Sequence, residues 1–545
     1  MPLGTQSEWG WHSFNNDSGY QRTETWKDYK GPGRNVPYSV QWDAPGRQRA
    51  AADWFRQNPH RLQLGNIGFE ILKKDGSRAA VNDLKNIKQQ LTLWTGEIKS
   101  QFSVEGSTIS VSTFCDQQQD IISVSIQSSL LREGRLKVFI RLPFPTGQWL
   151  DEGTNYAHDD KHKSSLSDVA NNRALLTHEI DSSRYFVQLA YTNARVTSPG
   201  QHYFLVTPDN ATGKFEFNCR FTPDALTTSL PGYVKTKNQN AIAWQRFWKS
   251  GGAIDFKGST DPRAHELERR IILSQYLLRI QEAGSYPPQE TGLTYNSWFG
   301  KPHLEMHWWH TVHNALWGRA ALMQRSLQWY QDVLPKAIAI AKRQGFSGAR
   351  WQKMTDNTGE ETPSSVGALL VWQQPHVIYF AELCFRDQDS LDKTQRPESP
   401  QFAPGIKSNP KQNNGKQDNR KQGISNPTNQ APEKMSARKM AILNKYKDLV
   451  FATAEFMASY AWYDSAQKRC QLGPALIPAQ ERFKPNETFN PTFELAYWRW
   501  ALTTAQQWKE RLNLPRDDKW DHVLQQLSPL PIKDGMYLAA ESAPD

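Results

Sequence analysis

Apolar and polar residues alternate with a period of two across residues 62–235, as in the segments 101–114 and 120–127. Alternation of this kind is typical of antiparallel strands that bury one face and expose the other. About ten such runs favour two packed antiparallel sheets. The pattern therefore predicts an antiparallel β-sandwich, which we place at residues 61–239.

The hydrophobic period becomes helical at about residue 261. Asp261 is a suitable N-cap, and Pro262 suits the first position of a helix. Leu267, Ile271 and Leu278 then recur on one face, which predicts an amphipathic helix. Further helices are predicted over the segments 303–330, 332–344, 364–386, 436–464, 491–512 and 517–527.

The remaining segments precede, connect or interrupt these two regions. Residues 1–60 are rich in Gly, Pro, Trp and Tyr, which predicts loops with short extended pieces and one short helix at 47–57. Residues 240–260 are interpreted as a linker, and the helical domain is placed at 261–545. A disordered insertion is expected at about 387–435, because its central polar run has no large apolar side chain to bury. The chain is thus predicted to be a multidomain β + α protein.

Composition adds one positive indication and several exclusions. The 545 residues include 21 Trp, whose flat rings suit the faces of sugars, although they also fill large cores. The net charge of +10 comes mainly from basic residues interspersed with acidic ones, so we expect no nucleic-acid partner. Four widely spaced cysteines exclude a disulfide-dense scaffold. No apolar run approaches the roughly 18 residues of a membrane-spanning helix, and the first residues do not form a signal peptide.

Three histidines share one helical face in the segment 295–319. His303, His307 and His310 follow the spacing i, i+4, i+7. This spacing is compatible with a metal site, with a polar pocket around a sugar, or with a hydrogen-bonded core. We favour the sugar pocket over the metal, because the HExxH pattern of zinc enzymes is absent.

A second candidate site is the irregular loop 345–363, which contains Arg350, Trp351 and Glu360. Loops at helix ends are where ligand-binding groups gather, so contact with a ligand is the functional interpretation. A surface turn without function is the alternative.

The third candidate site combines two carboxylic acids. Glu481 lies in a Pro-flanked apolar loop, and burial there would raise its pKa as a general acid requires. Glu494 lies in the first turn of the next helix, whose dipole favours the ionised form. Two carboxyl groups in opposed environments are what glycoside hydrolysis uses. For Glu494, stabilisation of its own helix is the alternative interpretation.

The order of these sites resembles the six-hairpin, (α/α)6-toroid glycosidases that carry an N-terminal β-sandwich, in particular glycoside hydrolase families 65 and 95. The segment 348–381 is similar to the loop and helix after the second hairpin in family 65, and the segment 479–491 is similar to its general-acid loop. The segment 303–309 resembles the Asn-x-x-Met-Asn-Tyr-Trp pattern of family 95. The resemblance implies a β-sandwich followed by toroid helices.

The resemblance places Glu481 at the position of the general acid. Gln480 stands where that loop has an acidic residue, and Arg482 stands where it has a tyrosine. His303 stands at the asparagine that helps to position the attacking water in family 95.

The predicted helices are fewer than six hairpins require, so we expect the toroid to be incomplete and the chain to be a fragment of a longer protein. In hydrolytic relatives the general base comes from the late helices, and it is expected to lie outside this chain. The candidates within the chain are Glu305, Glu494 and Glu541.

We therefore interpret the protein as an inverting glycoside hydrolase that acts on an oligo- or polysaccharide. Glu481 would protonate the leaving oxygen, and a carboxylate about 6.5–9.5 Å away would activate water. A sugar phosphorylase, a polysaccharide lyase of similar shape and a non-catalytic carbohydrate-binding protein are the alternatives. We expect no cofactor and no metal, and the resemblance implies a secreted or periplasmic protein. The expected substrate contacts are His303, Trp308, Trp309, Arg350, Trp351, Glu360 and Gln480.

Overall fold

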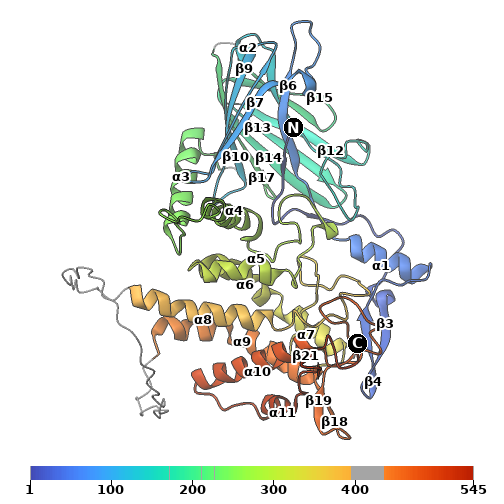
Figure 1. The fold of residues 1–545 in the computed structure, drawn as a ribbon. Helices are drawn as coiled ribbons and strands as arrows, with labels where there is room; N and C mark the ends of the chain where they lie inside the picture. Colours follow the sequence, from blue (N-terminus) through green and yellow to red (C-terminus); the bar gives the residue numbers. More distant parts are fainter. Residues whose placement is uncertain (1, 171, 210–211, 226–227, 395–434, 544–545) are drawn as a thin grey trace, which may run out of the picture.

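The computed structural model describes residues 2–170, 172–209, 212–225, 228–394 and 435–543. The predicted insertion at about 387–435 lies largely outside this part of the chain. Helix α8 (His376–Thr394) nevertheless continues past the predicted helix end at residue 386. The described chain has two main parts, with sheets at the top of Figure 1 and helices below them.

Two antiparallel sheets form the upper part. The five-stranded sheet has the order β1-β6-β11-β16-β15, and the eight-stranded sheet has the order β12-β13-β14-β17-β10-β9-β8-β7. In β13, Ala174, Leu176 and Ile180 are buried whereas Arg173 and Glu179 are exposed, so the alternation works as predicted. The predicted β-sandwich is confirmed. Its strands are β1 (Leu3–Thr5), β6 (Gly65–Ile71), β7 (Lys85–Thr92), β8 (Glu97–Val104), β9 (Ser107–Cys115), β10 (Ile121–Ser128), β11 (Leu136–Arg141), β12 (His162–Ala170), β13 (Arg173–Ile180), β14 (Ser183–Tyr191), β15 (Ala194–Gly200), β16 (Tyr203–Pro208) and β17 (Lys214–Thr222).

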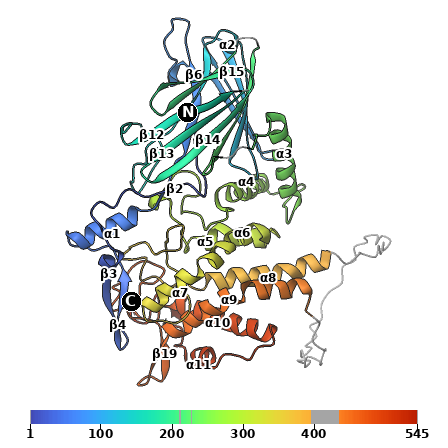
Figure 2. The same cartoon turned by 180° about the vertical axis from the view of Figure 1, so that it is seen from behind.

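The helices pack side by side below the sandwich and form a partial (α/α) toroid (Figure 2). One hydrophobic core runs through the helices from residue 307 onward, and in it the indole N–H of Trp498 donates to the carbonyl of Met457 at 2.9 Å. The two helices before residue 283 share a smaller separate cluster. None of the described helices combines the length and the apolar composition that a membrane crossing requires. Besides α8, the helices are α3 (Tyr233–Lys249), α4 (Ala264–Glu282), α5 (His307–Leu316), α6 (Ala320–Asp332), α7 (Leu334–Arg343), α9 (Ala437–Tyr460), α10 (Thr492–Arg511) and α11 (Asp518–Gln526).

Two helix predictions need correction. The predicted helix 303–330 is two helices, α5 and α6, because Gly318 between them has φ +71° and ends the first one. The predicted helix 364–386 begins only at His376. Its first part forms turns, and the guanidinium of Arg350 binds the carbonyls of Ala368 and Leu370 there.

The N-terminal segment joins the two parts and is more ordered than the loops we expected. Strand β1 pairs with β6 in the sandwich, and the predicted short helix is α1 (Arg47–Gln57). Between them a hairpin reaches the helical part, where Val36 and Tyr38 pack with Leu370 and Ile477. The remaining short elements are β2 (Trp11–His12), η1 (Arg22–Thr25), β3 (Trp26–Gly31), β4 (Arg34–Ser39), β5 (His60–Arg61), η2 (Val81–Asp83), α2 (Ser129–Arg132), η3 (Trp298–Gly300), β18 (Trp462–Asp464), β19 (Arg469–Gln471), β20 (Ile532–Lys533) and β21 (Met536–Tyr537).

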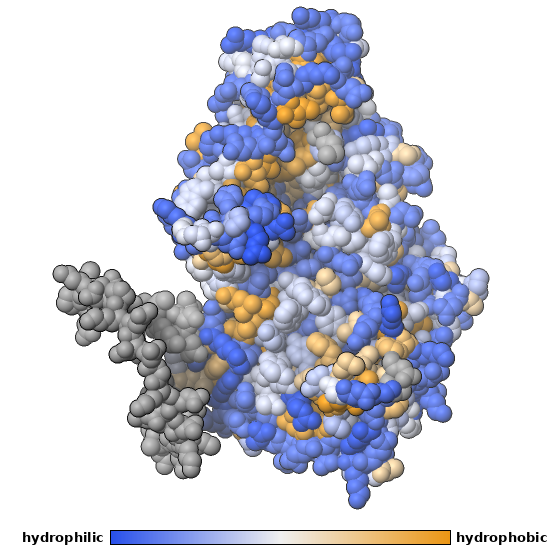
Figure 3. Space-filling view, viewed as in Figure 1, coloured by the Kyte–Doolittle hydropathy of each residue, from blue (hydrophilic) through white to orange (hydrophobic). Residues whose placement is uncertain are grey.

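The surface drawn in Figure 3 is mainly polar, with apolar patches on the sandwich and beside the helices below it. Over the described chain, the exposed apolar side chains include Ile242, Leu267, Trp309 and Leu316. Single exposed apolar residues are ordinary, so we draw no conclusion from them.

Helix α3 lies where the sandwich meets the helices, and its Trp244 is buried there with 3% exposure. The Trp244 ring stacks on Tyr276 of α4 with centroids 4.9 Å apart. On the sandwich side, Gly96 in the turn before β8 has φ +65°, and a Cβ at this residue would lie 2.1 Å from the Trp244 indole nitrogen. Only glycine therefore fits at this contact.

Gly96→Ala is expected to lower the free energy of unfolding by about 3 kcal/mol. The positive φ costs about 1–2 kcal/mol, and the overlap with Trp244 adds about 1–3 kcal/mol. Gly106→Ala is the matched control, because Gly106 has φ +82° and open space around its Cβ position. Urea unfolding of both variants measures the difference, and equal losses would show that the Trp244 contact does not require Gly96.

Candidate functional site

Three charged side chains from three separate loops meet at one end of the helices. Glu305 precedes α5, Lys353 follows α7, and Glu481 lies between β19 and α10. The Lys353 ammonium lies 2.8 Å from Glu305 Oε1 and also contacts Glu481 Oε1. We call Glu305, Lys353 and Glu481 the Lys353 cluster.

Backbone contacts hold these loops together. The amide of Leu304 donates to the carbonyl of Lys353 at 2.8 Å, which places Glu305 next to Lys353. The loop before Glu481 is connected to the segment before α8, because Ile477 donates to the carbonyl of Leu369 at 3.2 Å. Backbone hydrogen bonds between the loops thus position the cluster, although none of its members belongs to a helix or strand.

The three side chains differ in exposure. The side chains of Glu305 and Lys353 are 8% and 12% exposed, whereas that of Glu481 is 42% exposed. Burial raises the pKa of Glu305 to about 7; Lys353 opposes this shift and the Glu481 carboxylate adds to it. The cluster therefore has a buried carboxyl that holds a proton near neutral pH and an accessible carboxyl beside it.

The separation of the two carboxyls bears on the predicted reaction. Both contact the same nitrogen, so their nearest oxygens lie within about 6 Å of each other. A pair that inverts the anomeric centre needs about 6.5–9.5 Å to admit water. Glu305 therefore does not fit the general-base role for which it was a candidate.

Glu494 has a different place from the one we expected. It is fully buried, its Oε1 accepts the backbone N–H of Ala479 at 2.8 Å, and its Oε2 has no hydrogen-bond partner. Burial raises its pKa to about 7, against the expected ionised form, although the Ala479 N–H favours that form. An enclosed carboxyl cannot reach a water beside a substrate. Instead, Glu494 anchors the loop that carries Glu481.

The Trp298 ring lies beside Lys353 of the cluster. The Trp298 ring has the Lys353 ammonium 5.7 Å from its centroid and the His303 ring edge-on at 5.7 Å. Trp309, predicted as a sugar contact, is 54% exposed and lies edge-on to Trp372. Exposed or half-buried indoles of this kind offer flat apolar faces to a ligand.

The other expected sugar contacts divide into accessible and inaccessible residues. Gln480 is exposed next to Glu481, and Trp308 is half-buried. Glu360 is half-buried and pairs with Lys336 of α7 at 2.7 Å. His303 is accessible only over 1% of its surface, and its Nε2 has no hydrogen-bond partner.

Arg350 and Trp351 need correction as substrate contacts, because each is only 2% exposed. Arg350 binds main-chain carbonyls, and the Trp351 indole N–H donates to the Thr453 hydroxyl at 2.9 Å. Both residues are buried, and they supply hydrogen bonds to backbone and side-chain groups that the irregular loops leave without partners.

The histidine face of α5 is mostly hydrogen-bonded core. His307 contacts the hydroxyls of Tyr330 and Ser326, each at 3.0 Å. His310 lies 3.6 Å from the buried carboxyl of Glu282. Within the described chain, these histidines do not bring three ligand atoms close enough together for a metal ion. Of the three interpretations, the hydrogen-bonded core describes His307 best.

Lys353 and Trp298 were missed by the sequence analysis. Lys353 is an isolated lysine in a loop, and no spacing or motif connects it with Glu305 or Glu481. Trp298 was one of many tryptophans, and its importance follows only from its position beside Lys353.

No family model and no curated protein sequence matches this chain. Its fold is similar to that of a solved structure described as "Putative kojibiose phosphorylase from human microbiome", with a TM-score of 0.53 and 9% identity over 89% of this chain and 64% of that one. A bacterial glucoamylase complexed with acarbose gives a TM-score of 0.49 and 11% identity over 86% and 61% of the two chains. The family GH92 α-mannosidase from Bacteroides thetaiotaomicron gives 0.30 and 10% over 85% and 56%.

The chain spans less than two thirds of the length of each of these structures. The first match confirms the expected fold, a β-sandwich followed by a partial (α/α) toroid like that of six-hairpin glycosidases.

Glu494→Gln is expected to flatten the pH dependence of stability. A carboxyl whose folded pKa, about 7, exceeds its ordinary value of 4.5 stabilises the folded state fully below 4.5, and this contribution is lost as the pH rises through 7. The loss is up to about 1.4 kcal/mol per pH unit for each such group. Glutamine can still accept the Ala479 N–H but cannot ionise.

Urea unfolding at several pH values between about 4.5 and 8 tests this expectation. The slope should decrease without vanishing, because burial also raises the pKa of Glu305 to about 7. Glu487→Gln is the control, since Glu487 is exposed on the same loop. An unchanged slope in Glu494→Gln would mean that Glu494 is ionised in the folded protein.

Proposed function

We propose that the protein cleaves glycosidic bonds of an oligo- or polysaccharide as a glycoside hydrolase, with Glu481 as the general acid. The observation that supports this most is the Lys353 cluster, in which an accessible carboxyl lies beside a buried one that holds a proton near neutral pH. Paired carboxyls with different environments are the basis of glycosidic cleavage.

Glu481 can act as the acid when its contact with Lys353 is given up. Glu305 and Lys353 are both buried and 2.8 Å apart, so a Glu305 carboxylate that has released its proton can balance the Lys353 ammonium without it. A protonated Glu481 would then transfer its proton to the glycosidic oxygen as the bond from that oxygen to the anomeric carbon breaks. Water would add to the anomeric carbon and lose a proton to a base.

We do not assign the base to the three carboxyls considered for it. Glu305 lies too close to Glu481 for an inverting pair, and Glu494 is enclosed. Glu541 is paired with Arg469 and Asn490. Glu481 is therefore the carboxyl on which the hydrolase proposal depends.

Trp298 and Trp309 are proposed as the sugar contacts, together with Gln480 beside Glu481. Trp298 is half-buried beside Lys353, and Trp309 is exposed. Stacking of a sugar on such a ring buries apolar C–H groups and leaves its hydroxyls free for the polar residues.

Glu481→Gln is expected to reduce hydrolysis by about 10²–10⁴-fold, because the amide cannot protonate the leaving oxygen. Release of reducing sugar from a panel of oligosaccharides measures the activity. Glu487→Gln is the matched control, since it removes an exposed carboxyl from the same loop. Full activity of Glu481→Gln would contradict its role as the acid.

The same assay with and without inorganic phosphate separates hydrolysis from phosphorolysis. Hydrolysis gives free sugar in both conditions, whereas a phosphorylase releases a sugar phosphate and depends on the added phosphate. Strict phosphate dependence would replace the hydrolase proposal with the phosphorylase alternative.

A further inference from the structure

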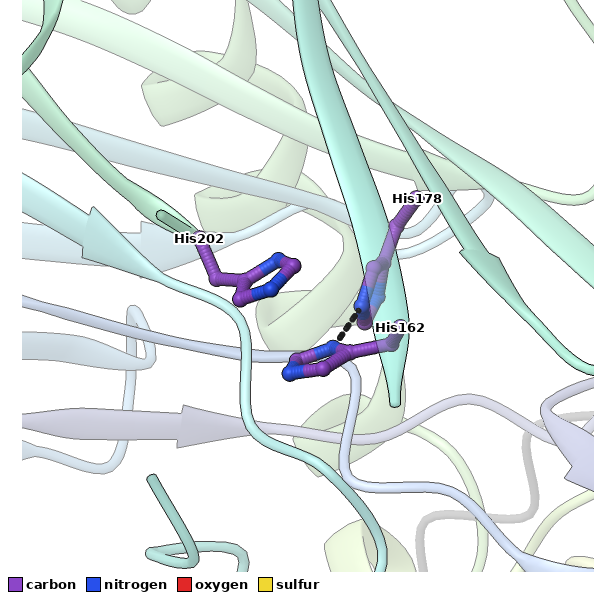
Figure 4. A group of neighbouring side chains, drawn as sticks. All are labelled: His162, His178 and His202. Carbon is purple, nitrogen blue, oxygen red and sulfur yellow. Dashed lines mark hydrogen bonds between the residues drawn. The ribbon is translucent and has the colours of Figure 1, made fainter. Parts of the chain in front are cut away.

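Three histidines from neighbouring segments of the sandwich meet in one buried group (Figure 4). His162 begins β12, His178 belongs to β13, and His202 lies in the turn between β15 and β16. Their exposures are 6%, 0% and 5%. One ring nitrogen of each lies within 4.8 Å of the corresponding nitrogens of the other two.

The hydrogen bonds of His178 identify which of its nitrogens carries the proton. The Tyr185 hydroxyl donates to the carbonyl of Leu64, so its oxygen accepts from His178 Nδ1 at 2.6 Å. His178 Nε2 is then an unprotonated nitrogen. It faces His162 Nδ1 at 2.6 Å, which must be the donor (Figure 4).

The other two histidines also keep one unprotonated nitrogen each. His162 Nε2 is buried without a hydrogen-bond partner. His202 Nε2 lies 3.1 Å from the carbonyl of Asp159 and must donate to it, so His202 Nδ1 accepts from the hydroxyl of Ser164. In this arrangement His162 Nε2 is unpartnered, whereas His178 Nε2 and His202 Nδ1 accept hydrogen bonds. The three rings share one buried space.

Apolar side chains would be the ordinary occupants of these positions. His178 lies on the same face of β13 as Leu176 and Ile180, which belong to the sandwich core. Burial of polar rings is costly unless they find partners, and His162 Nε2 has none.

We propose that His162, His178 and His202 bind a divalent first-row transition metal ion of the Zn²⁺ class. Imidazole nitrogens are preferred ligands of Zn²⁺, Cu²⁺ and Ni²⁺, and three of them make a common zinc ligand set. This site is independent of the proposed glycosidase function, and it departs from our expectation that the protein has no metal.

The surroundings of the rings suit metal ligands. Metal-bound histidines usually donate their second N–H to a fixed acceptor. The Tyr185 hydroxyl has this role for His178, and the carbonyl of Asp159 has it for His202. An ion between His162 and His178 would replace the proton they share. His162 would then bind through Nδ1 and carry its proton on Nε2, which has no protein partner in the structure.

One ring must turn when the metal binds. The rings of His162 and His202 are stacked with centroids 3.5 Å apart and planes at 14°, and parallel rings cannot both point at one ion. Rotation of a histidine ring about its Cβ–Cγ bond meets only a low barrier between broad minima. In the stack, hydrogen bonds use the nitrogens that a metal would take.

Calorimetric titration of the chelator-treated full chain with Zn²⁺ at about pH 7.5 tests the proposal. We expect one ion per chain with a Kd below about 1 µM and a higher midpoint of thermal unfolding. His202→Gln should weaken binding by at least about 100-fold, and Tyr185→Phe by about 10–100-fold. His158→Gln is the control and should bind as the unchanged protein does, since His158 is a half-buried neighbour outside the three.

Absence of tight Zn²⁺ binding to the unchanged protein would overturn the proposal and leave a hydrogen-bonded histidine stack. Unchanged affinity in a folded His202→Gln variant would also overturn it. If His202→Gln does not fold, Co²⁺ titration of the unchanged protein decides the question. Visible absorption bands of nitrogen-coordinated Co²⁺ that Zn²⁺ abolishes are the expected result, and their absence contradicts a three-histidine site.

Discussion

The arrangement of the three loops that carry Glu305, Lys353 and Glu481 depends on the buried ammonium of Lys353. A cation that is only 12% exposed requires counter-charges, and Glu305 and Glu481 supply them from two other loops. Two ionised carboxylates would exceed the charge of one lysine, and the raised pKa of Glu305 relieves this excess by keeping a proton there near neutrality. The cluster thus joins three irregular segments and retains an exchangeable proton near an accessible carboxyl, which is the physical basis for assigning acid chemistry to it.

The loops around the cluster are fixed by side chains that bind backbone. Arg350 binds the carbonyls of Ala368 and Leu370, and Glu494 accepts the amide of Ala479. Irregular backbone has no ladder of hydrogen bonds, so its buried groups need such partners. This requirement explains why Arg350 and Glu494, which attract attention as binding or catalytic residues in the sequence, lie inside the protein instead of facing a ligand.

Periodic features could be predicted from the sequence, and contacts between distant loops could not. The alternation in strands such as β13 and the short helix α1 depends on neighbouring residues, and both were found correctly. The break at Gly318 was missed because a helical hydrophobic pattern continues across it. Glu481 was selected because burial was expected in its Pro-flanked loop, and this expectation is wrong, since its side chain is 42% exposed. Lys353 has no sequence signal, because its partners lie 48 and 128 residues away along the chain. The three sandwich histidines come from separate turns and strands and were likewise unrecognisable.

The histidine cluster and the Lys353 cluster differ in charge, and this difference separates their chemistry. No carboxylate makes a hydrogen bond or an ion pair with His162, His178 or His202 among the described residues, so the hydrogen-bond partners of the three rings are uncharged groups. The carboxyls around Lys353 hold or release a proton instead. The N-terminal segment contacts both parts of the protein. Asp181, in the turn after β13, accepts a hydrogen bond from His12 of this segment. Further along, the β3–β4 hairpin of the same segment packs on the loops of the helical part. An ion that secures β12, β13 and the turn before β16 would therefore stabilise the end of the sandwich on which the N-terminal segment folds, without entering the proposed reaction.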